Sequence, residues 1–572
     1  MLRVSERCKP STVRQEHQRL RQIGRVIRPV SYTHLRSGVR DGVEFSGGLF
    51  ERWNHVANTF AFHDGGGAFP PGHFGDGPGH WVVGSEQTWT TGNSQRSFAL
   101  DAWEHRVSFR DVTTLPTPSA ARAEGRAHRK VVSRHSLGDL EPRGTGYDPI
   151  ARLIELGTHR VQELLPIRYE RMLASPFGFF RGSALLMADD LARGVSSNIE
   201  VQICGDAHLS NFGIFRSAEQ RLVYDINDFD ETDCGSFEWD VKRLATSLAI
   251  AAEQNGLNKD QQEALAVAAA REYRLSLRRL AHESLIKVWY SVLDVDAVMS
   301  ELGSFFNEET LHDLDTVLQT AVDKSSSKPP RGLVEWLDGR PTLVSDPPLV
   351  VPLDQLDPKS ELVGARGTLS DVIRDYSNSL SPDRRVLLNQ FTPVDAARKV
   401  VGVGSVGTRC FIILLVGRNA KDTFFLQVKE ASTSVVALAR GLNSELSGGA
   451  RVVRGQKIMQ ATPDPFLGWH DVEEPTGPTS YYVREQFDHR SAVRVEQLDG
   501  DHLFDYGRLC AWALARAHAR SGGTSVLEGY LGKGDTFDQA IGVFSMAYLE
   551  RNKEDYEALK SAVSEGRISV AQ

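Results

Sequence analysis

The sequence has few cysteines, no long apolar run and no strong excess of either charge. Its five cysteines include no pair at Cys-x-x-Cys spacing, which argues against a zinc site and against a disulfide framework. The longest apolar run, Cys410–Val416, is far shorter than the roughly 20 residues that a membrane helix needs. No charged-then-apolar stretch of the signal-peptide kind opens the chain. We therefore expect a cytoplasmic protein with reduced thiols and no membrane partner.

The net charge of −8 gives no general attraction to nucleic acid, so no nucleic-acid partner is expected. With 572 residues, the chain exceeds the size of one hydrophobic core, which stops growing near roughly 250–300 residues. Two or more packed units are therefore expected. The oligomeric state cannot be read from these properties.

Changes in composition along the chain predict an α+β fold with five segments. Gly, His and Pro crowd the first segment without sustained periodicity, which indicates an atypical or poorly ordered extension. The expected segments are this extension (1–110), a helical lobe with the acidic loops (147–325), a proline-rich connection with helices (326–392), a β-rich lobe (393–500) and C-terminal helices packed on the helical lobe (501–572).

Two acidic loops follow short strand-like stretches in the helical segment. CGDAHLSNFG carries Asp206, His208 and Asn211, and NDFDE carries Asp228 and Asp230. Phosphoryl transfer needs a carboxylate that orients the attacking hydroxyl and oxygen ligands that hold Mg²⁺ against the phosphates. Asp206 is therefore a candidate catalytic residue, and Asn211, Asp228 and Asp230 are candidate metal ligands.

These residues also have structural interpretations. Asp206 and Asn211 are common turn residues, and Asp230 suits a surface acid or a partner of a ligand. A packed, hydrogen-bonded imidazole is the more ordinary role for His208.

A glycine motif, Gly402, Gly404 and Gly407, lies between strand-like stretches of the β-rich segment. Glycine lets the backbone approach phosphates closely. The Rossmann form of this motif requires a helix directly afterwards, whereas the strongly β stretch TRCFIILLVG follows here. A polar break at 418–422 then separates this stretch from the next strand, which predicts a hairpin. The second strand carries Lys429, which is costly to bury without an anionic partner. The motif and Lys429 are therefore candidate nucleotide-binding groups, with a lysine that extends to the sheet edge as the structural alternative.

The anionic partner of Lys429 stays open between Glu430 and Glu445. Arg181 and Arg409 are candidate clamps for phosphate or substrate, because the guanidinium fork matches phosphate oxygens. Pairing of either arginine with a structural carboxylate is equally compatible with the sequence.

The pattern G-D-x-H-x-x-N resembles the catalytic loop of aminoglycoside and choline kinases, in the protein-kinase-like superfamily. The resemblance implies that Asp206 is the catalytic base, that Asn211 and Asp228 bind Mg²⁺, and that His208 shapes the loop. It also implies that Asp240 buttresses this loop from the following helix.

One position departs from that pattern, and so does the order of the motifs. Cys204 stands where the kinases have a histidine, which puts the usual bracing of the loop in doubt. The glycine motif follows Asp206 instead of preceding it. Either the fold is kinase-like and circularly permuted, with the helical lobe first, or the glycine–lysine segment belongs to another nucleotide-binding fold. LARAH, which ends at His518, resembles the stretch before the catalytic loop of aminoglycoside kinases and favours permutation.

Seven short motifs together are similar to a bacterial family known as domain of unknown function 2252, from roughly Ile150 to the C-terminus. That resemblance supplies no substrate. The motifs are SPFxFxRG, CGDAHLxNFG, NDFDE, GVGSVGTR, QVKEA, ARAHARSG and GYLG.

These observations predict an ATP- and Mg²⁺-dependent phosphotransferase that acts on a hydroxyl of an unknown small molecule or protein. The alternatives are a nucleotide-binding pseudokinase or regulatory protein and an AMP transferase on the same fold. A metal-dependent hydrolase built on the acids is weaker, because it leaves the glycine motif and Lys429 unexplained.

Overall fold

The computed structural model describes most of the chain from residue 117 onwards, and these residues belong to one compact unit. Helices and strands both contribute, which confirms the α+β class. The predicted extension, 1–110, lies outside the described residues. Within the described part of the chain, no helix has both the length and the apolar content of a membrane span. The described ranges are 117–219, 221–294, 333–337, 339–356, 369–400, 402–474, 477–486 and 493–571.

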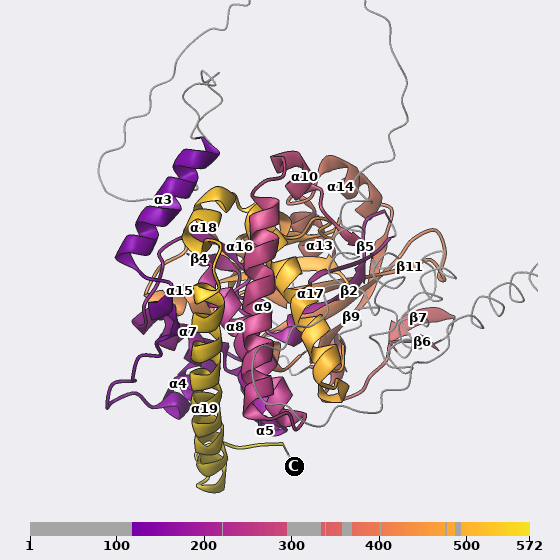
Figure 1. The fold of residues 1–572 in the computed structure, drawn as a ribbon. Coiled ribbons are helices and arrows are strands. Elements are labelled where there is room, and N and C mark those ends of the chain that lie inside the picture. The colour runs from indigo at the N-terminus through magenta and orange to yellow at the C-terminus, as the bar shows by residue number, and fades with distance from the viewer. Residues whose placement is uncertain are drawn as a thin grey trace, which may run out of the picture. The chain divides into compact units, whose positions relative to one another are not determined.

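Helices form most of the lobe that comes first along the described chain (Figure 1). Several of these helices begin at a short polar residue whose side chain caps the first turn. The Asp148 carboxylate accepts hydrogen bonds from two backbone N–H groups, and Asn258 and Gln261 form a reciprocal capping box. The helices of this lobe are α3 (Pro118–Val131), α4 (Pro149–Gly157), α5 (Leu165–Leu173), α6 (Pro176–Gly182), α7 (Ala184–Arg193), α8 (Glu238–Gln254), α9 (Lys259–Leu280) and α10 (Leu285–Trp289).

The C-terminal helices return to this lobe. α17 (Gly500–Arg520) and α19 (Thr536–Ser564) both pack against α8 and α9, and the long helices α9, α17 and α19 run near one another in Figure 1. α18 (Thr524–Leu531) packs on α3. The last 70 or so residues therefore complete the core that the first helices begin.

Two small sheets in the helical lobe hold the acidic loops together. β1 (Glu200–Ile203) pairs with β4 (Asp233–Ser236), and β2 (Phe212–Arg216) pairs with β3 (Leu222–Ile226), to which β5 (Leu293–Asp294) adds. The first loop leaves β1 where Ile203 faces Asp233, and it enters β2 where Phe212 faces Ile226. The second loop connects β3 with β4, so both ends of each loop are tied to the other loop by strand pairing.

A six-stranded antiparallel sheet forms the β-rich lobe, in the order β12-β13-β11-β10-β9-β8. The hairpin predicted around the polar break at 418–422 is confirmed, because β10 and β11 pair from Cys410↔Lys429 to Val416↔Thr423. β13 pairs with the other side of β11, which places Tyr482 opposite Lys429. The strands are β8 (Val350–Pro352), β9 (Thr392–Lys399), β10 (Cys410–Val416), β11 (Thr423–Glu430), β12 (Gly468–Glu474) and β13 (Gly477–Glu485).

The proline-rich stretch, expected as a connection, contains strands in its described part. β6 (Val334–Leu337) and β7 (Arg340–Leu343) form a separate hairpin, and β8 is an edge strand of the main sheet. An edge position tolerates proline, because the missing N–H need not pair. The remaining helices of the β-rich lobe are α13 (Leu369–Ser377), α14 (Pro382–Leu388), α15 (Val435–Arg440) and α16 (Gly448–Met459).

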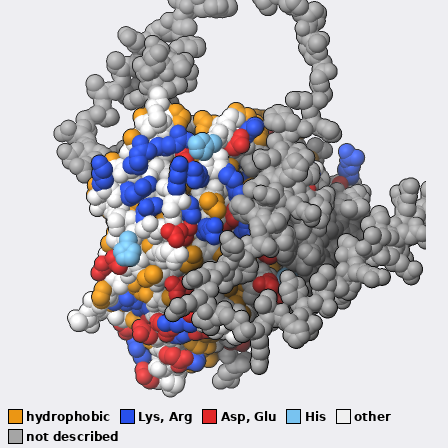
Figure 2. All heavy atoms as spheres, in the orientation of Figure 1, with side chains coloured by type: hydrophobic (Ala, Val, Ile, Leu, Met, Phe, Trp, Pro, Cys, Tyr) orange, Lys and Arg blue, Asp and Glu red, His pale blue; other side chains and the backbone are white. Residues whose placement is uncertain are grey.

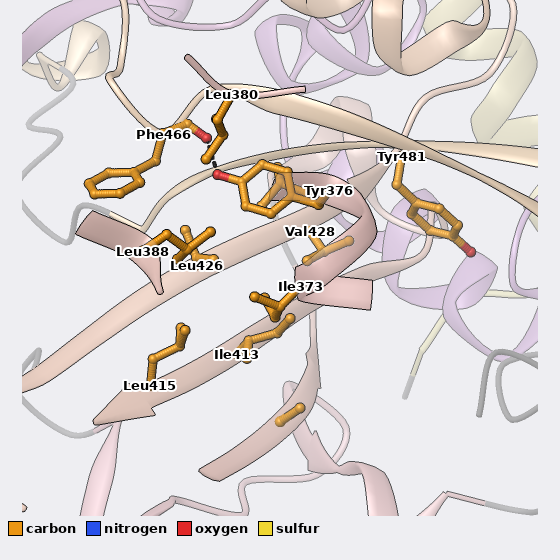
Figure 3. Close-up of a cluster of buried hydrophobic side chains, with 12 residues drawn as sticks. Ile373, Tyr376, Leu380, Leu388, Ile413, Leu415, Leu426, Val428, Phe466 and Tyr481 are labelled. Atoms are coloured by element: carbon orange, nitrogen blue, oxygen red, sulfur yellow. Dashed lines mark hydrogen bonds between the residues drawn. The ribbon is translucent and has the colours of Figure 1, made fainter. Parts of the chain in front are cut away.

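A hydrophobic cluster holds α13 and α14 against the main sheet (Figure 3). Tyr376 and Leu388 from the helices pack with Ile413 and Leu426 from the strands. The Tyr376 hydroxyl donates to the backbone carbonyl oxygen of Phe466, which satisfies the one polar group of a fully buried ring. This cluster fixes the sheet that carries Lys429.

Basic side chains gather on the face over α3, although the whole chain is acidic (Figure 2). Arg129 of α3 and Arg134, which follows it, have a structural role. Arg129 Nε donates to the carbonyl oxygen of Tyr530 at 2.8 Å, and Arg134 donates to that of Leu531 at 2.5 Å. Both carbonyls end α18, so these arginines satisfy its C-terminal acceptors and oppose its dipole.

We predict that Leu426→Ala lowers the free energy of unfolding by about 2–5 kcal/mol, because Leu426 is fully buried in the cluster of Figure 3 and its truncation leaves a cavity. Denaturant unfolding measures this loss. The matched control is Leu285→Ala, at a position 79% exposed, which we expect to change stability by less than about 0.5 kcal/mol. Equal effects of the two substitutions would contradict the placement of Leu426.

Candidate active site

Asp240 of α8 holds the start of the loop between β1 and β2 through two hydrogen bonds. Its carboxylate accepts hydrogen bonds from the backbone N–H groups of Cys204, at 2.8 Å, and Gly205, at 3.0 Å. Gly205 has a φ of +78°, and a Cβ there would lie 2.1 Å from the carbonyl oxygen of Glu231. Only glycine therefore fits, and the two acidic loops touch at this point.

Asp240 is held in turn by His518 of α17. His518 Nε2 lies 3.1 Å from the carboxylate, and because a carboxylate only accepts, this nitrogen carries a hydrogen. His518 Nδ1 lies 2.8 Å from the Tyr273 hydroxyl. His518 and Asp240 are almost fully buried. An imidazole from a helix more than 300 residues later therefore helps to hold the loop that begins at Cys204.

Asp206 stands on this braced loop and lines the cavity. Arg243 Nε donates to its Oδ1 at 2.8 Å, and His208 Nε2 lies 3.7 Å from its Oδ2. Burial raises the pKa of the Asp206 carboxyl, and the Arg243 guanidinium opposes part of that rise. One oxygen is therefore fixed, and the carboxylate is a better proton acceptor than an exposed aspartate.

Asn211 and Asp228 line the same cavity, as does His208. Asn211 Nδ2 donates to the backbone carbonyl oxygen of Asp206 at 2.7 Å, which leaves the Asn211 amide oxygen for another partner. Burial, with smaller contributions from Arg181 and Arg243, holds the pKa of His208 well below its usual range. His208 is therefore neutral, as its packed structural interpretation expects.

Asp230 meets the β-rich lobe directly. Its Oδ2 pairs with Lys429 Nζ and accepts from the Ser405 hydroxyl at 2.8 Å, and its Oδ1 accepts from the Tyr482 hydroxyl at 2.7 Å. Burial alone would raise the pKa of Asp230, but the Lys429 ammonium outweighs it and lowers that pKa. In the same way, Asp230 overcomes burial and raises the pKa of Lys429. Neither of the two glutamates considered from the sequence is this partner.

The glycine motif forms a turn of 3₁₀ helix between β9 and β10. Gly402 and Gly404 line the cavity, whereas Gly407 does not. Gly407 has a φ of +91°, and a Cβ there would lie 3.0 Å from Arg160. Gly407 therefore shapes the loop from outside the cavity.

Arg409 does not line the cavity. Its backbone N–H and its guanidinium both contact the Glu430 carboxylate, at 2.9 and 3.4 Å. Of the two interpretations of Arg409, this geometry favours the structural one. Arg181, the other candidate clamp, does line the cavity.

The cavity has a volume of about 140 Å³ and a highly charged wall. Carboxylates of both acidic loops face cations there, and most binding pockets are mainly apolar by comparison. The cationic residues of the wall are Arg160, Arg168, Arg181, Lys429 and Arg484, and the acidic ones are Asp206, Asp228, Asp230 and Glu231.

Several of these residues were not singled out from the sequence. Arg160, Arg168 and Arg484 come from segments with no motif of their own, so only the fold brings them to the cavity. Tyr482, which contacts Asp230, lies on β13 opposite Lys429 and belongs to no motif either. Ser405 lay inside the glycine motif itself.

The donor set fits Mg²⁺ only in company with phosphates. Within the described residues, no group of three His, Cys, Asp or Glu side chains is arranged to hold a metal. Mg²⁺ at nucleotide sites usually takes one or two carboxylates and completes its shell with phosphate oxygens and water. Asp228 and the amide oxygen of Asn211 meet that requirement.

Comparison with known proteins gives one match. A family model described as an uncharacterized protein conserved in bacteria (DUF2252) matches residues 160–562. No curated protein and no solved structure matches.

We predict that Asp240→Asn loosens the loop that carries Asp206. An amide cannot accept both backbone hydrogen bonds, so a buried N–H loses its partner, which costs about 1–3 kcal/mol. Hydrogen exchange of the backbone amides at 204–211 should therefore become faster. Asp538→Asn, which breaks a buried pair with Arg274, is the matched control. It should lower stability without selectively speeding exchange in 204–211, and equal exchange in both variants would rule out the bracing role.

Proposed function

The chain belongs to the DUF2252 family of uncharacterised bacterial proteins, and we propose that it is an ATP- and Mg²⁺-dependent phosphotransferase that acts on a hydroxyl group. The cytoplasm is its proposed compartment, because Cys204, Cys234, Cys410 and Cys510 are free thiols in the described chain.

The convergence of two distant segments on one cavity is the observation that carries this proposal. The acidic loops and the glycine–lysine hairpin meet at the Asp230–Lys429 pair, whose members are 199 residues apart in sequence. Phosphoryl transfer relies on positioning and on charge stabilisation more than on covalent chemistry. A wall that combines carboxylates with cations is suited to both tasks.

Asp206 is the proposed catalytic base. Arg243 holds its Oδ1, so Oδ2 is the oxygen that orients the acceptor hydroxyl and takes its proton. The raised pKa of this carboxyl favours proton transfer, because a base accepts more readily as its pKa approaches the working pH.

Asn211 and Asp228 are the proposed ligands of Mg²⁺, which would neutralise the charge of the phosphates when bound. Lys429 and the glycine loop are the proposed phosphate-binding groups. Because Asp230 now takes the hydrogen bonds of Lys429 and Ser405, an incoming phosphate competes with this carboxylate. The released Asp230 would then lie beside Asp228 and could contribute to the metal shell.

A circularly permuted kinase-like fold is the proposed architecture. A glycine loop, a hairpin and a strand lysine follow one another from β9 to β11, and α16 comes before β12 and β13. This is the series of elements in the nucleotide lobe of kinases. One difference is clear: kinases pair the lysine with a helix glutamate, but α16 has no acidic residue, and Asp230 pairs with Lys429 instead.

A nucleotide-binding regulatory protein is the second candidate. The observation that favours it is the occupation of Lys429, Ser405 and Tyr482 by one internal carboxylate. Such a protein would bind ATP but would not consume it.

We predict that Asp206→Asn lowers ATP-dependent phosphorylation by roughly 10²–10⁴-fold, the usual contribution of a general base. The affinity for ATP with Mg²⁺ should change little. Mass spectrometry of a small-metabolite extract incubated with the full chain and labelled ATP measures the transfer, and calorimetry measures ATP binding. Undiminished transfer by the variant would exclude Asp206 as the base, and ATP binding without any transfer by the wild type would favour the regulatory protein.

We also predict that Lys429→Met weakens ATP binding by about tenfold or more, which corresponds to about 1.4 kcal/mol. Lys421→Met, at an exposed turn between β10 and β11, is the matched control and should bind ATP as the wild type does. Lys429→Met leaves the buried Asp230 carboxylate unpaired and so also lowers stability. The double variant Lys429→Met/Asp230→Asn removes that charge, so any remaining loss of ATP affinity comes from the missing lysine. If that double variant keeps full ATP affinity, Lys429 does not bind phosphate.

A further inference from the structure

Four arginines in the cavity wall lack a carboxylate partner within the described chain. Arg160 and Arg168 donate to backbone carbonyl oxygens of the glycine loop, and Arg484 donates to the side-chain oxygen of Gln427 at 2.8 Å. Arg181 makes no hydrogen bond or ion pair with any residue that the structure describes. Each of the first three arginines donates at least one hydrogen bond to a neutral oxygen, whereas all the donors of Arg181 are available to a ligand within the described chain.

Arg181 is partly buried, which makes its lack of a partner costly. Burial lowers its pKa, and the carboxylates of Asp206, Glu496 and Asp228 oppose part of that effect from a distance. A guanidinium removed from water without hydrogen bonds is destabilising. Proteins usually retain such a group where a ligand completes its hydrogen bonds.

Arg181 belongs to the wall of the cavity that carries the proposed base. The preceding residue, Phe180, accepts a hydrogen bond from Arg243 through its carbonyl oxygen at 2.6 Å, and its ring lies under the same guanidinium at 3.7 Å. Arg243 in turn holds Asp206. α6 therefore fixes Arg181 and Asp206 relative to each other.

The proposed phosphate-binding groups come from other elements than Arg181 does. Lys429 lies on β11, and Arg484 lies on β13 beside Tyr482. The strands thus supply cations for the nucleotide, and α6 supplies a separate cation, Arg181. His208 also lines the cavity, and its buried Nδ1 has no hydrogen-bond partner within the described residues.

We propose that the acceptor is a small anionic molecule and that Arg181 binds its phosphate or carboxylate group while Asp206 receives its hydroxyl. The inference rests on the proposed phosphotransferase function and names the class of its acceptor. A guanidinium binds such oxyanions through two parallel hydrogen bonds, which fixes the orientation of the molecule as well as its affinity.

The test uses inorganic phosphate as the probe and the full chain saturated with a non-hydrolysable ATP analogue and Mg²⁺. Calorimetry should show phosphate binding to the wild type, and Arg181→Gln should weaken it by about tenfold or more. Arg181→Lys keeps the positive charge but cannot form two parallel hydrogen bonds, so we expect a smaller loss of phosphate affinity, about threefold. The matched control is Arg126→Gln, at an exposed position of α3, which should leave phosphate binding unchanged.

Three outcomes would overturn the inference. The first is that the wild type binds no phosphate up to about 50 mM, well above the millimolar range of weak anion sites. The second is that the wild type and Arg181→Gln bind phosphate equally well. The third is that Arg181→Gln loses affinity for the nucleotide, which would assign Arg181 to the nucleotide. If Arg181→Gln does not fold, equal phosphate affinity of Arg181→Lys and the wild type is the contradicting result.

A failure of the proposed function would look different. In that case the wild type would not bind the ATP analogue, whereas phosphate binding that depends on Arg181 would still identify an anion site in the nucleotide-free protein.

Discussion

The ion pair between Lys429 and Asp230 is the contact on which the site depends. A buried ammonium and a buried carboxylate are each costly alone, so the fold is stable only when both are present and in register. The pair joins the main sheet to the second acidic loop, and Tyr482 and Ser405 add hydrogen bonds to the same carboxylate. It thereby holds the glycine loop close to the proposed base.

Asp206 and Asp230 both line the cavity, but they are held in different ways, and this difference suits their proposed roles. Asp206 stands on a loop that Asp240, His518 and strand pairing hold from several directions. Asp230 is held mainly by groups that could bind phosphate instead. A fixed base beside an exchangeable carboxylate allows a ligand to enter without displacing the catalytic loop.

Local sequence patterns predicted those parts of the site whose residues lie close together in the sequence. The positions of Asp206, Asn211 and Asp228 follow from a motif on one loop and an acid at the next strand end, and the structure brings them to one cavity. The polar break at 418–422 likewise predicted the hairpin that carries Lys429.

Contacts between distant segments could not be predicted in this way. The partner of Lys429 was sought among nearby glutamates, but it comes from a loop 199 residues earlier. Arg168 carries no signal in the sequence, because its role arises only when α5 meets the glycine loop. Pro352 hid the strand β8, because an edge position accepts a proline that the sequence pattern counts against a strand.

A crystal structure of the full chain with a non-hydrolysable ATP analogue and Mg²⁺ tests the central claim most directly. The account predicts phosphate oxygens about 3 Å from the Lys429 ammonium, the cation on Asp228 and Asn211, and the Asp230 carboxylate released from Lys429. A nucleotide bound outside this cavity, with the Lys429–Asp230 pair intact, would contradict it.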